Sequence, residues 1–310
     1  MLAVLAAVAL AAACVPRTTP LTAGEAAGEA AGESGDVSVA ASGVPGEGRG
    51  MPRPSNGCDA ASAMDPTGRV VVDGIERTFL ARVPSGPAAA PRDLVLAFHG
   101  RTNDAAQVRR YVRLDAALPE AVIVYPRALP TVPGAFAWGG PGDPPERQRD
   151  FALVEALIAA FGEAHCLDLD RVFVVGHSLG AYFANDVACR LGERVRAVAS
   201  VGGGLQADGC VGGAAALLVH HPDDRLVPVR EGSAARDAFR RANALGLAPA
   251  TPVTSGPMAR LRCARHGAAG AANPVVWCAR DDASTPRGYG RHTWPAGAAA
   301  AIGAFFASLE

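Results

Sequence analysis

Short apolar runs recur along this chain from about residue 69 onward, and amphipathic stretches separate them. Five of the runs are apolar at nearly every position: Leu94–Phe98, Ala121–Tyr125, Val172–Val175, Ala197–Val201 and Ala215–Val219. Such runs are typical of strands that are buried on both faces, as in a parallel sheet. Ahead of them, two strand-like segments flank Asp73-Gly74, which predicts an opening β-hairpin.

The stretches between the runs have the periodicity of helices. From Phe151 to Phe161, apolar residues recur every three or four positions and so share one helical face. Strands and helices in alternation predict an α/β fold, with one mostly parallel central sheet and helices on both of its faces. Ligands of such sheets bind at the carboxyl ends of the strands. Functional residues are therefore expected in loops that follow strands.

The composition fits one large domain with a buried core. Of the 310 residues, 49% are hydrophobic and 19% are charged, and the pattern continues from residue 58 to residue 310 without a second linker. A formal net charge of −1 gives no electrostatic argument for a nucleic-acid partner. Because every one of the 29 basic residues is arginine, the sequence excludes a P-loop lysine and a Schiff-base lysine.

The N-terminal segment predicts export. Residues 1–14 form an apolar run about as long as the hydrophobic region of a signal peptide, too short to cross a bilayer as a helix. Cys14 follows three alanines, as in a bacterial lipoprotein signal, so we expect a lipid on Cys14. There are two alternatives: the protein is secreted after cleavage at an Ala-x-Ala site, or residues 1–14 form a buried apolar segment. Residues 15–57 are rich in Ala, Gly, Glu and Pro and predict a disordered linker. The expected location is outside a bacterial cell or in its envelope.

An even number of further cysteines predicts up to three disulfides: Cys58, Cys166, Cys189, Cys210, Cys263 and Cys278. Cys263 and Cys278 flank a turn between two strand-like runs and are expected to pair. The other four allow three connectivities. Because two of them are expected at the end of the sheet opposite the active site, we favour Cys166 with Cys189, which leaves Cys58 with Cys210. The alternative is that some are buried thiols.

The pentapeptide Gly176-His177-Ser178-Leu179-Gly180 lies between a buried strand-like run and a helical stretch. A sharp strand-to-helix turn needs small residues two positions on either side of the serine. Such a turn exposes the serine Oγ and brings the next backbone N–H, that of Leu179, toward a developing oxyanion. In this context a nucleophilic Ser178 is favoured over a purely structural turn.

A serine nucleophile needs a base, and in hydrolases with this turn an acid and then a histidine follow the serine along the chain. His292 is the last of seven histidines and follows the final strand-like run, so it is the expected base. His266 is expected to be a solvated surface residue. The acid is expected after the run that comes two after the nucleophile strand, where the sequence has two carboxylates, Asp223 and Asp224.

The loop His99-Gly100-Arg101 follows the first buried run and is expected to complete the site. Glycine lets the backbone approach a substrate closely, so the N–H of Arg101 is the expected second oxyanion donor beside that of Leu179. A loop turn without function is the alternative.

The sequence also holds a cluster of metal-ligand residue types: His220, His221, Asp223 and Asp224. Adjacent residues rarely converge on one ion, and no other ligand group is conspicuous. We therefore expect no metal and no organic cofactor.

These motifs resemble those of exported esterases of the α/β-hydrolase fold, a group of feruloyl esterases, acetyl xylan esterases and short-chain polyhydroxybutyrate depolymerases that includes lipoproteins. The resemblance covers residues 58–310. It rests on FHGRTN at 98–103, the helix start at Asp150, the C-x-D-x-D-R-V-F-V-x-G-x-S-x-G block at 166–180, D-x-x-V-P from Asp224 and G-x-G-x-H-x-W-P around His292. Two departures bear on substrate choice: Arg291 replaces a frequent glycine, and Arg101 holds an oxyanion position that is often small or apolar.

The resemblance implies a serine carboxylic-ester hydrolase for feruloyl or acetyl esters, acting through an acyl-enzyme on Ser178. It favours Asp224 as the acid, because Asp224 fits the D-x-x-V-P pattern, and leaves Asp223 as the alternative. The alternatives are a polyhydroxyalkanoate depolymerase with the same triad, an acyltransferase, and a catalytically silent envelope binding protein. The expected partner is a small-molecule or polysaccharide-linked ester, with membrane anchoring through a lipidated Cys14. The candidates for the substrate cleft are His99, Gly100, His177, Trp138 and Trp294.

Overall fold

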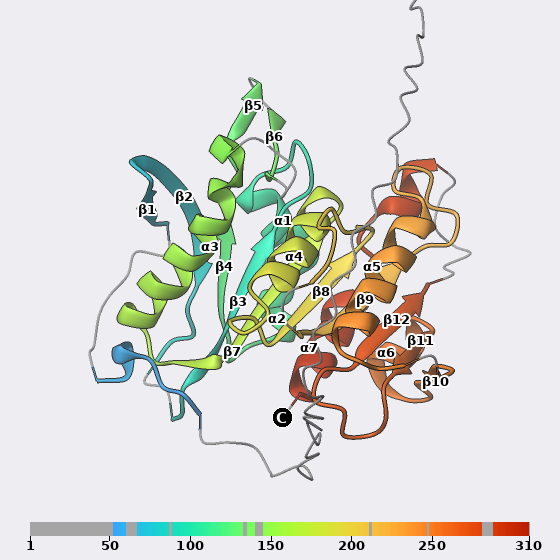
Figure 1. The fold of residues 1–310 in the computed structure, drawn as a ribbon. Coiled ribbons are helices and arrows are strands. Elements are labelled where there is room, and N and C mark those ends of the chain that lie inside the picture. Colours follow the sequence, from blue (N-terminus) through green and yellow to red (C-terminus); the bar gives the residue numbers. More distant parts are fainter. Residues whose placement is uncertain are drawn as a thin grey trace, which may run out of the picture. The chain divides into compact units, whose positions relative to one another are not determined.

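The apolar runs of the sequence form neighbouring strands of one ten-stranded sheet (Figure 1). The computed structural model describes residues 52–59, 67–86, 89–132, 135–139, 145–210, 213–246, 248–280 and 288–309, all within the unit Gly46–Glu310. The predicted signal peptide, Cys14 and the linker up to residue 51 lie outside these residues. No helix in this part of the chain is both long and apolar enough to cross a membrane.

Six parallel strands form the centre of the sheet, and antiparallel strands form its edges. In spatial order the strands are β1 (Arg69–Val72), β2 (Ile75–Arg82), β4 (Val122–Pro126), β3 (Arg92–Phe98), β7 (Leu167–His177), β8 (Ala197–Val201), β9 (Ala215–His220), β12 (Val275–Ala279), β11 (Cys263–His266) and β10 (Thr251–Pro252). The parallel group runs from β4 to β12. The predicted mostly parallel sheet is therefore confirmed. A separate two-stranded sheet pairs β5 (Pro130–Val132) with β6 (Ala135–Phe136).

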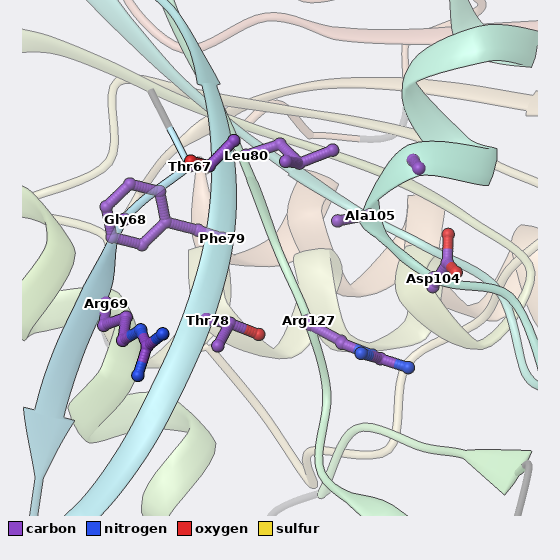
Figure 2. A pocket seen from close by; sticks show the side chains of 10 residues that line it. Thr67, Gly68, Arg69, Thr78, Phe79, Leu80, Asp104, Ala105 and Arg127 are labelled. Carbon is purple, nitrogen blue, oxygen red and sulfur yellow. The ribbon is translucent and has the colours of Figure 1, made fainter. Parts of the chain in front are cut away.

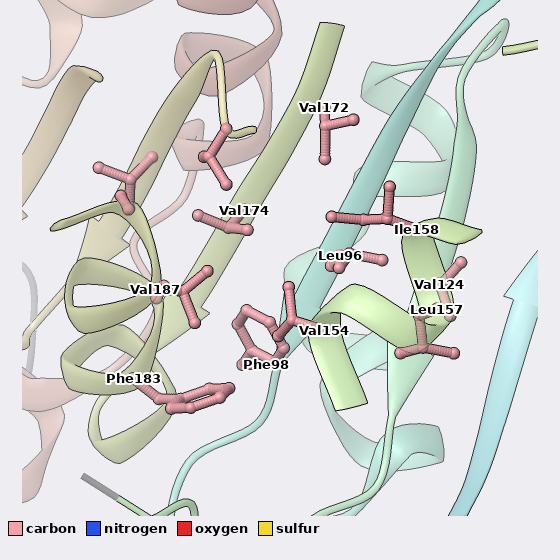
Figure 3. Packing of buried hydrophobic residues seen from close by; sticks show 14 of the residues in the cluster. Leu96, Phe98, Val124, Val154, Leu157, Ile158, Val172, Val174, Phe183 and Val187 are labelled. Carbon is pink, nitrogen blue, oxygen red and sulfur yellow. The ribbon is translucent and has the colours of Figure 1, made fainter. Parts of the chain in front are cut away.

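Helices cover both faces of the central sheet. They are α1 (Ala105–Val112), α2 (Leu114–Ala117), α3 (Pro145–Ala164), α4 (Leu179–Arg190), α5 (Val229–Ala242), α6 (Gly256–Arg260) and α7 (Ala298–Ala307). Successive side chains of a strand point to opposite faces. In β3, Leu96 and Phe98 accordingly pack with residues of α3 and α4 (Figure 3), whereas Val95 and Ala97 pack with residues of α1 and α7. The predicted arrangement of helices on both faces is confirmed.

The opening hairpin also has the predicted geometry. Asp73 and Gly74 both have left-handed backbone angles, with φ of 49° and 76°. A two-residue turn with both residues at positive φ matches the twist of the two strands that it joins, β1 and β2. The helix predicted over Phe151–Phe161 is present but longer than predicted, since α3 begins at Pro145 and ends at Ala164.

Three disulfides connect the six cysteines of the domain, and two of the expected pairings are wrong. Cys263 pairs with Cys278 as predicted, across the register of β11 and β12. The other bonds join Cys58 to Cys166 and Cys189 to Cys210. Cys189 lies near the end of α4, where it meets the loop after β8. Cys166, just before β7, instead meets the short helix η1 (Asn56–Cys58).

Part of the segment counted with the linker packs on the domain. Ser55 is 5% exposed; its backbone N–H donates to the carbonyl oxygen of Leu167 at 2.9 Å, and its hydroxyl donates to that of His165 at 2.7 Å. A side chain on Gly57 would collide with the backbone of His165. The packed residues of the domain therefore begin before Cys58.

A buried ion pair connects the edge of the sheet to α3. Arg77 of β2 is 1% exposed, and its Nη2 lies 2.6 Å from Asp150 Oδ1. Asp150 Oδ2 also accepts the backbone N–H of Gly139 at 2.8 Å. The pair therefore holds together a strand, a helix and the loop that carries Trp138.

We expect Arg77→Met to lower the free energy of unfolding by about 3 kcal/mol, because it leaves the Asp150 carboxylate buried without its cation. Arg69→Met is the matched control on the neighbouring strand. Arg69 pairs with Glu76 while both side chains are more than half exposed, so its loss should cost under about 1 kcal/mol. Urea unfolding of both variants tests this, and equal losses would contradict it.

Candidate active site

Ser178 lies in a strained turn between β7 and α4. Its φ of 57° and ψ of −125° are unusual for a residue with a side chain, and it precedes the first residue of α4. A side chain on Gly176 would collide with the backbone of Gly180, and one on Gly180 would collide with the backbone of Phe98. The spacing of the two glycines is therefore what lets β7 turn directly into α4.

The structure brings Ser178, His292 and Asp224 into one hydrogen-bonded series. His292 Nε2 lies 2.8 Å from Ser178 Oγ, and His292 Nδ1 lies 2.7 Å from Asp224 Oδ2. Asp224 is in the loop after β9, and His292 ends the short helix η2 (Gly288–His292) after β12. All three residues follow the carboxyl ends of parallel strands, where side chains from separate strands can meet.

The two adjacent aspartates have different surroundings. Asp224 is 6% exposed, and its Oδ1 accepts the backbone N–H groups of Leu226 and Val227 at 2.9 and 3.0 Å. Burial by itself would raise the pKa of Asp224, but the hydrogen bonds from His292 and these N–H groups outweigh burial and lower it. The carboxyl of Asp223 is 64% exposed and forms an ion pair with Arg291. Of the two aspartates, only Asp224 forms a hydrogen bond with His292.

Gly202, which follows β8, lies against the pair of His292 and Asp224. Its φ is 61°, and a Cβ there would lie 3.2 Å from His292 Cε1 and 3.3 Å from His292 Nδ1. The position therefore needs glycine both for its backbone conformation and for the space of the imidazole. Sequence analysis missed this residue, although a run of three glycines directly after a buried strand was a usable signal.

The loop after β3 approaches the serine. A Cβ on Gly100 would lie 3.3 Å from Ser178 Cβ, and Arg101 is exposed in the turn that follows. Leu179 is the first residue of α4, and N–H groups in the first turn of a helix have no partner within that helix. The roles of Arg101 and Leu179 as oxyanion donors stay predictions.

Two residues expected in the substrate cleft, His99 and Trp138, are buried in the protein. His99 is fully buried; its Nε2 accepts the N–H of Ala128 at 3.1 Å, and its Nδ1 donates to the carbonyl oxygen of Gly100 at 2.8 Å. Trp138 is 4% exposed, stacks on Phe183 and donates its indole N–H to the His99 carbonyl oxygen at 2.8 Å. Gly100 is buried as well. His99 and Trp138 therefore stabilise the loop after β3 through hydrogen bonds to the backbone of residues 99 and 100.

His177 and Trp294 lie in a half-buried aromatic cluster with Tyr111, a residue that sequence analysis missed. The ring centroids of Tyr111 and His177 are 5.4 Å apart, and those of His177 and Trp294 are 6.1 Å apart. Tyr111 comes from α1, far away in the sequence and without any motif around it. The cluster contacts the base through His177, whose ring centroid is 5.4 Å from that of His292.

The residues of the possible metal cluster have separate partners. His220 Nε2 donates to the Val227 carbonyl oxygen at 2.8 Å, and His221 Nδ1 accepts the N–H of Asp223 at 3.0 Å. No group of three or more potential metal ligands occurs within the described ranges. The expected surface position of His266 is wrong, because this residue is 9% exposed on β11, where it pairs with β12.

One cavity of about 440 Å³ lies outside this site, between β2 and the start of α1 (Figure 2). The charged side chains that line it already have partners. Asp104 accepts the Gln107 N–H at 2.8 Å and caps α1, and the guanidinium of Arg127 lies 4.2 Å from the ring centroid of Phe136. The lining residues do not include Ser178 or its partners, so the cavity is not part of the series described above.

We expect acidification from pH 6.5 to about 4 to lower the free energy of unfolding. Burial lowers the pKa of His99 and His177 from 6.5 to about 4, so in this range the unfolded chain binds two protons that the folded chain excludes. Burial raises the pKa of Asp186 from 3.8 to about 6, which opposes the effect by one proton at most. Asp186→Asn should therefore make the fall steeper. Urea unfolding at several pH values tests this, and constant stability would contradict it.

Comparisons with known proteins point to esterases. No family model matches the chain. It is 32% identical over 97 residues to feruloyl esterase D of Neurospora crassa, covering 30% of this chain and 33% of that protein. It is 26% identical over 178 residues to a protein of Aspergillus terreus described as a probable feruloyl esterase C. That match covers 54% of this chain and 62% of the relative. The chain thus spans less than two thirds of the length of these relatives.

Solved esterase structures have the same fold. The carboxylesterase of Bacillus cereus is 15% identical with a TM-score of 0.53, over 74% of this chain and 93% of that one. An acetyl xylan esterase from Aspergillus awamori is 13% identical with a TM-score of 0.50, over 66% of this chain and 87% of that one. The described domain has the α/β-hydrolase fold, and the resemblance to esterases of that fold, predicted from the motifs, is confirmed.

Proposed function

We propose that this protein is a serine carboxylic-ester hydrolase with Ser178 as nucleophile. The observation that carries the proposal is the hydrogen-bonded series from Ser178 Oγ through His292 to Asp224. Serine is a weak nucleophile unless a base accepts its proton, and the 2.8 Å separation of Oγ and Nε2 allows that transfer.

In the first half of the reaction, Ser178 Oγ bonds to the ester carbonyl carbon while its proton passes to His292 Nε2. The tetrahedral intermediate then collapses, the bond to the alcohol oxygen breaks, and His292 returns the proton to that oxygen. Asp224 holds the Nδ1 proton of the imidazole and stabilises the transient imidazolium. The products of this half are a free alcohol and an acyl-enzyme.

In the second half, a water molecule gives one proton to His292 and attacks the acyl carbon. Collapse of the second tetrahedral intermediate releases the acid and returns the proton to Ser178 Oγ. In both halves the carbonyl oxygen becomes negatively charged. The N–H groups of Leu179, at the start of α4, and Arg101, beside the close approach of Gly100 to Ser178, are the proposed donors to this oxygen.

The proposed substrates are feruloyl or acetyl esters. The names of the relatives favour this class, and the half-buried rings of Tyr111 and Trp294 near His177 offer aromatic surface close to the serine. Export fits the three disulfides of the domain, since disulfides persist in oxidising compartments. Attachment of a lipid at Cys14 remains part of the proposal.

A panel of three esters tests the function: methyl ferulate, p-nitrophenyl acetate and a hydroxybutyrate oligomer. We expect hydrolysis of the first two by the full chain and none by the Ser178→Ala variant. Turnover of the oligomer alone would favour the depolymerase alternative, and transfer to an added alcohol in place of water would favour an acyltransferase.

A fluorophosphonate probe tests the nucleophile without assuming a substrate. The Ser178 oxygen should displace fluoride from phosphorus and form a stable ester, which mass spectrometry locates on one peptide. Labelling that survives in Ser178→Ala would mean that another residue is the nucleophile and would overturn the assignment of Ser178. A chain that neither reacts nor hydrolyses any ester would overturn the proposal in favour of a silent binding protein.

A further inference from the structure

Side chains from outside η2 bind three consecutive backbone carbonyls around His292. Arg280 Nη2 donates to the carbonyl oxygens of Arg291 at 2.6 Å and Thr293 at 2.9 Å. Between them, His177 Nε2 lies 2.8 Å from the carbonyl oxygen of His292 itself. Because a carbonyl oxygen only accepts, His177 must donate from Nε2. Every peptide carbonyl from 291 to 293 is thereby fixed by another element.

Arg280 is itself held firmly at the end of the sheet. It is 3% exposed and directly follows β12, and its backbone N–H donates to the His220 carbonyl oxygen at the end of β9 at 3.1 Å. The loop that carries Asp224 starts from the same strand, β9. Arg280 therefore connects the strand that leads to the acid with the segment that carries the base.

His177 makes the corresponding connection to the nucleophile. It immediately precedes Ser178, and its Nδ1 lies 3.2 Å from the hydroxyl oxygen of Tyr111. The His292 carbonyl sets the tautomer with the proton on Nε2, and Nδ1 can then accept the Tyr111 proton, so the tyrosine hydroxyl is compatible with this tautomer. Burial lowers the pKa of His177 to about 4, which keeps the ring neutral in this arrangement at neutral pH.

The base needs such support because of where it lies. η2 is a five-residue 3-10 helix rather than part of a strand or long helix. Side chains on loops are held less precisely than those on regular elements unless neighbouring groups fix them. The distances of 2.8 Å to Ser178 and 2.7 Å to Asp224 leave little room for movement of the His292 backbone.

We propose that Arg280 and His177 are positioning residues, which hold the three carbonyls of residues 291–293 so that the His292 imidazole stays between Ser178 and Asp224. This inference rests on the proposed function, since the imidazole is the base of that reaction. Neither residue exchanges a proton with the substrate. They act on the rate only through the position of His292.

Arg280→Met tests the first of the two residues. It keeps the length and burial of the side chain but removes the donors, and we expect kcat to fall about 100-fold with a smaller change in KM, as for displacement of a catalytic group by about 1 Å. Arg194→Met is the matched control. Arg194 is more than half exposed and pairs with Glu155, so kcat should not change. If Arg280→Met does not fold, Arg280→Lys is the second variant. Its side chain keeps the positive charge but is too short to place a nitrogen at the position of Nη2, which donates to both carbonyls, so kcat should fall about tenfold. An unchanged kcat in a folded Arg280→Lys protein would contradict the role of Arg280.

Two variants of His177 test the second residue. His177→Gln keeps an N–H donor and an acceptor, whereas His177→Leu keeps neither. We expect His177→Leu to lower kcat at least tenfold and His177→Gln to restore most of the loss. A role in packing alone predicts the opposite order, because leucine is the better apolar filler of a half-buried site.

Proton NMR gives a readout that needs no ester. The hydrogen bond from His292 Nδ1 to Asp224 should give a far-downfield resonance, assigned by its absence in His292→Ala. We expect it to broaden or vanish in Arg280→Met and His177→Leu and to persist in Arg194→Met. Unchanged resonances together with unchanged kcat would overturn the inference. A wild-type protein that has the resonance but hydrolyses no ester would overturn the proposed function instead, and the NMR comparison would still decide the role of the two residues.

Discussion

The kcat of the Ser178→Ala variant is expected to be about 10⁶-fold lower than that of the wild type on any ester that the protein hydrolyses. The change removes the single atom that bonds to the acyl carbon, so His292 has no serine proton to accept and no acyl-enzyme can form. Residual catalysis of about 10³ over the uncatalysed reaction can remain from oxyanion donors and substrate binding alone. Removal of His292 is expected to lower kcat by a similar factor, because the serine and its base act as a unit.

The fold should survive this substitution. Alanine keeps the Cβ of the serine, so the left-handed φ of 57° costs the variant no more than it costs the wild type. The variant loses the 2.8 Å hydrogen bond to His292 Nε2, a partly solvated contact. A melting temperature within a few degrees of wild type is the expected result for a loss of about 1 kcal/mol.

Ser308→Ala is the matched control for this experiment. The Ser308 hydroxyl donates to the Phe305 carbonyl oxygen at the end of α7 at 2.7 Å, and both the rate and the fluorophosphonate labelling should be unchanged. Initial rates on methyl ferulate and p-nitrophenyl acetate are the measurement. A Ser178→Ala protein that is folded and retains a tenth of the wild-type rate would rule out Ser178 as nucleophile.

The centre of the fold could be predicted because its strands are buried on both faces. Val95 and Leu96 of β3 pack on opposite sides of the sheet, so no position in the run tolerates a polar side chain. The edges carried no such signal. The two-residue strand β10 is exposed on both residues. The pairing of the other four cysteines, apart from Cys263 with Cys278, also escaped prediction, because it depends on where η1 and the loop after β8 return to the sheet.

The series of Ser178, Asp224 and His292 could be predicted from a local motif and from the order of strands. The residues around it could not. Trp138 stands next to glycines in a loop, a typical cleft sequence, yet its burial depends on Phe183 of α4. Arg280 reaches the site through contacts across the sheet that no motif records.

The kcat of the Asp224→Asn variant is expected to fall about 10⁴-fold, because the variant holds the His292 imidazole in the wrong tautomer. Asp224 Oδ1 accepts the N–H groups of Leu226 and Val227, and an amide nitrogen cannot accept, so the amide oxygen of the variant must keep that place. Its NH₂ then replaces Oδ2 and points at His292 Nδ1. An NH₂ group only donates, so Nδ1 must give up its proton to Nε2. With that proton, Nε2 can no longer accept one from Ser178 Oγ.

Asp223→Asn separates this effect from the loss of a nearby charge. The Asp223 carboxyl is 64% exposed and pairs with Arg291, so its removal should change kcat less than about threefold. Both variants keep the size of the side chain, and both lower the negative charge of the same loop by one. Steady-state rates at pH 7.5 on p-nitrophenyl acetate compare them. Equal losses would mean that the charge of the loop, and not the hydrogen bond to His292 Nδ1, supports the base, and Asp224 would then lose its assigned role.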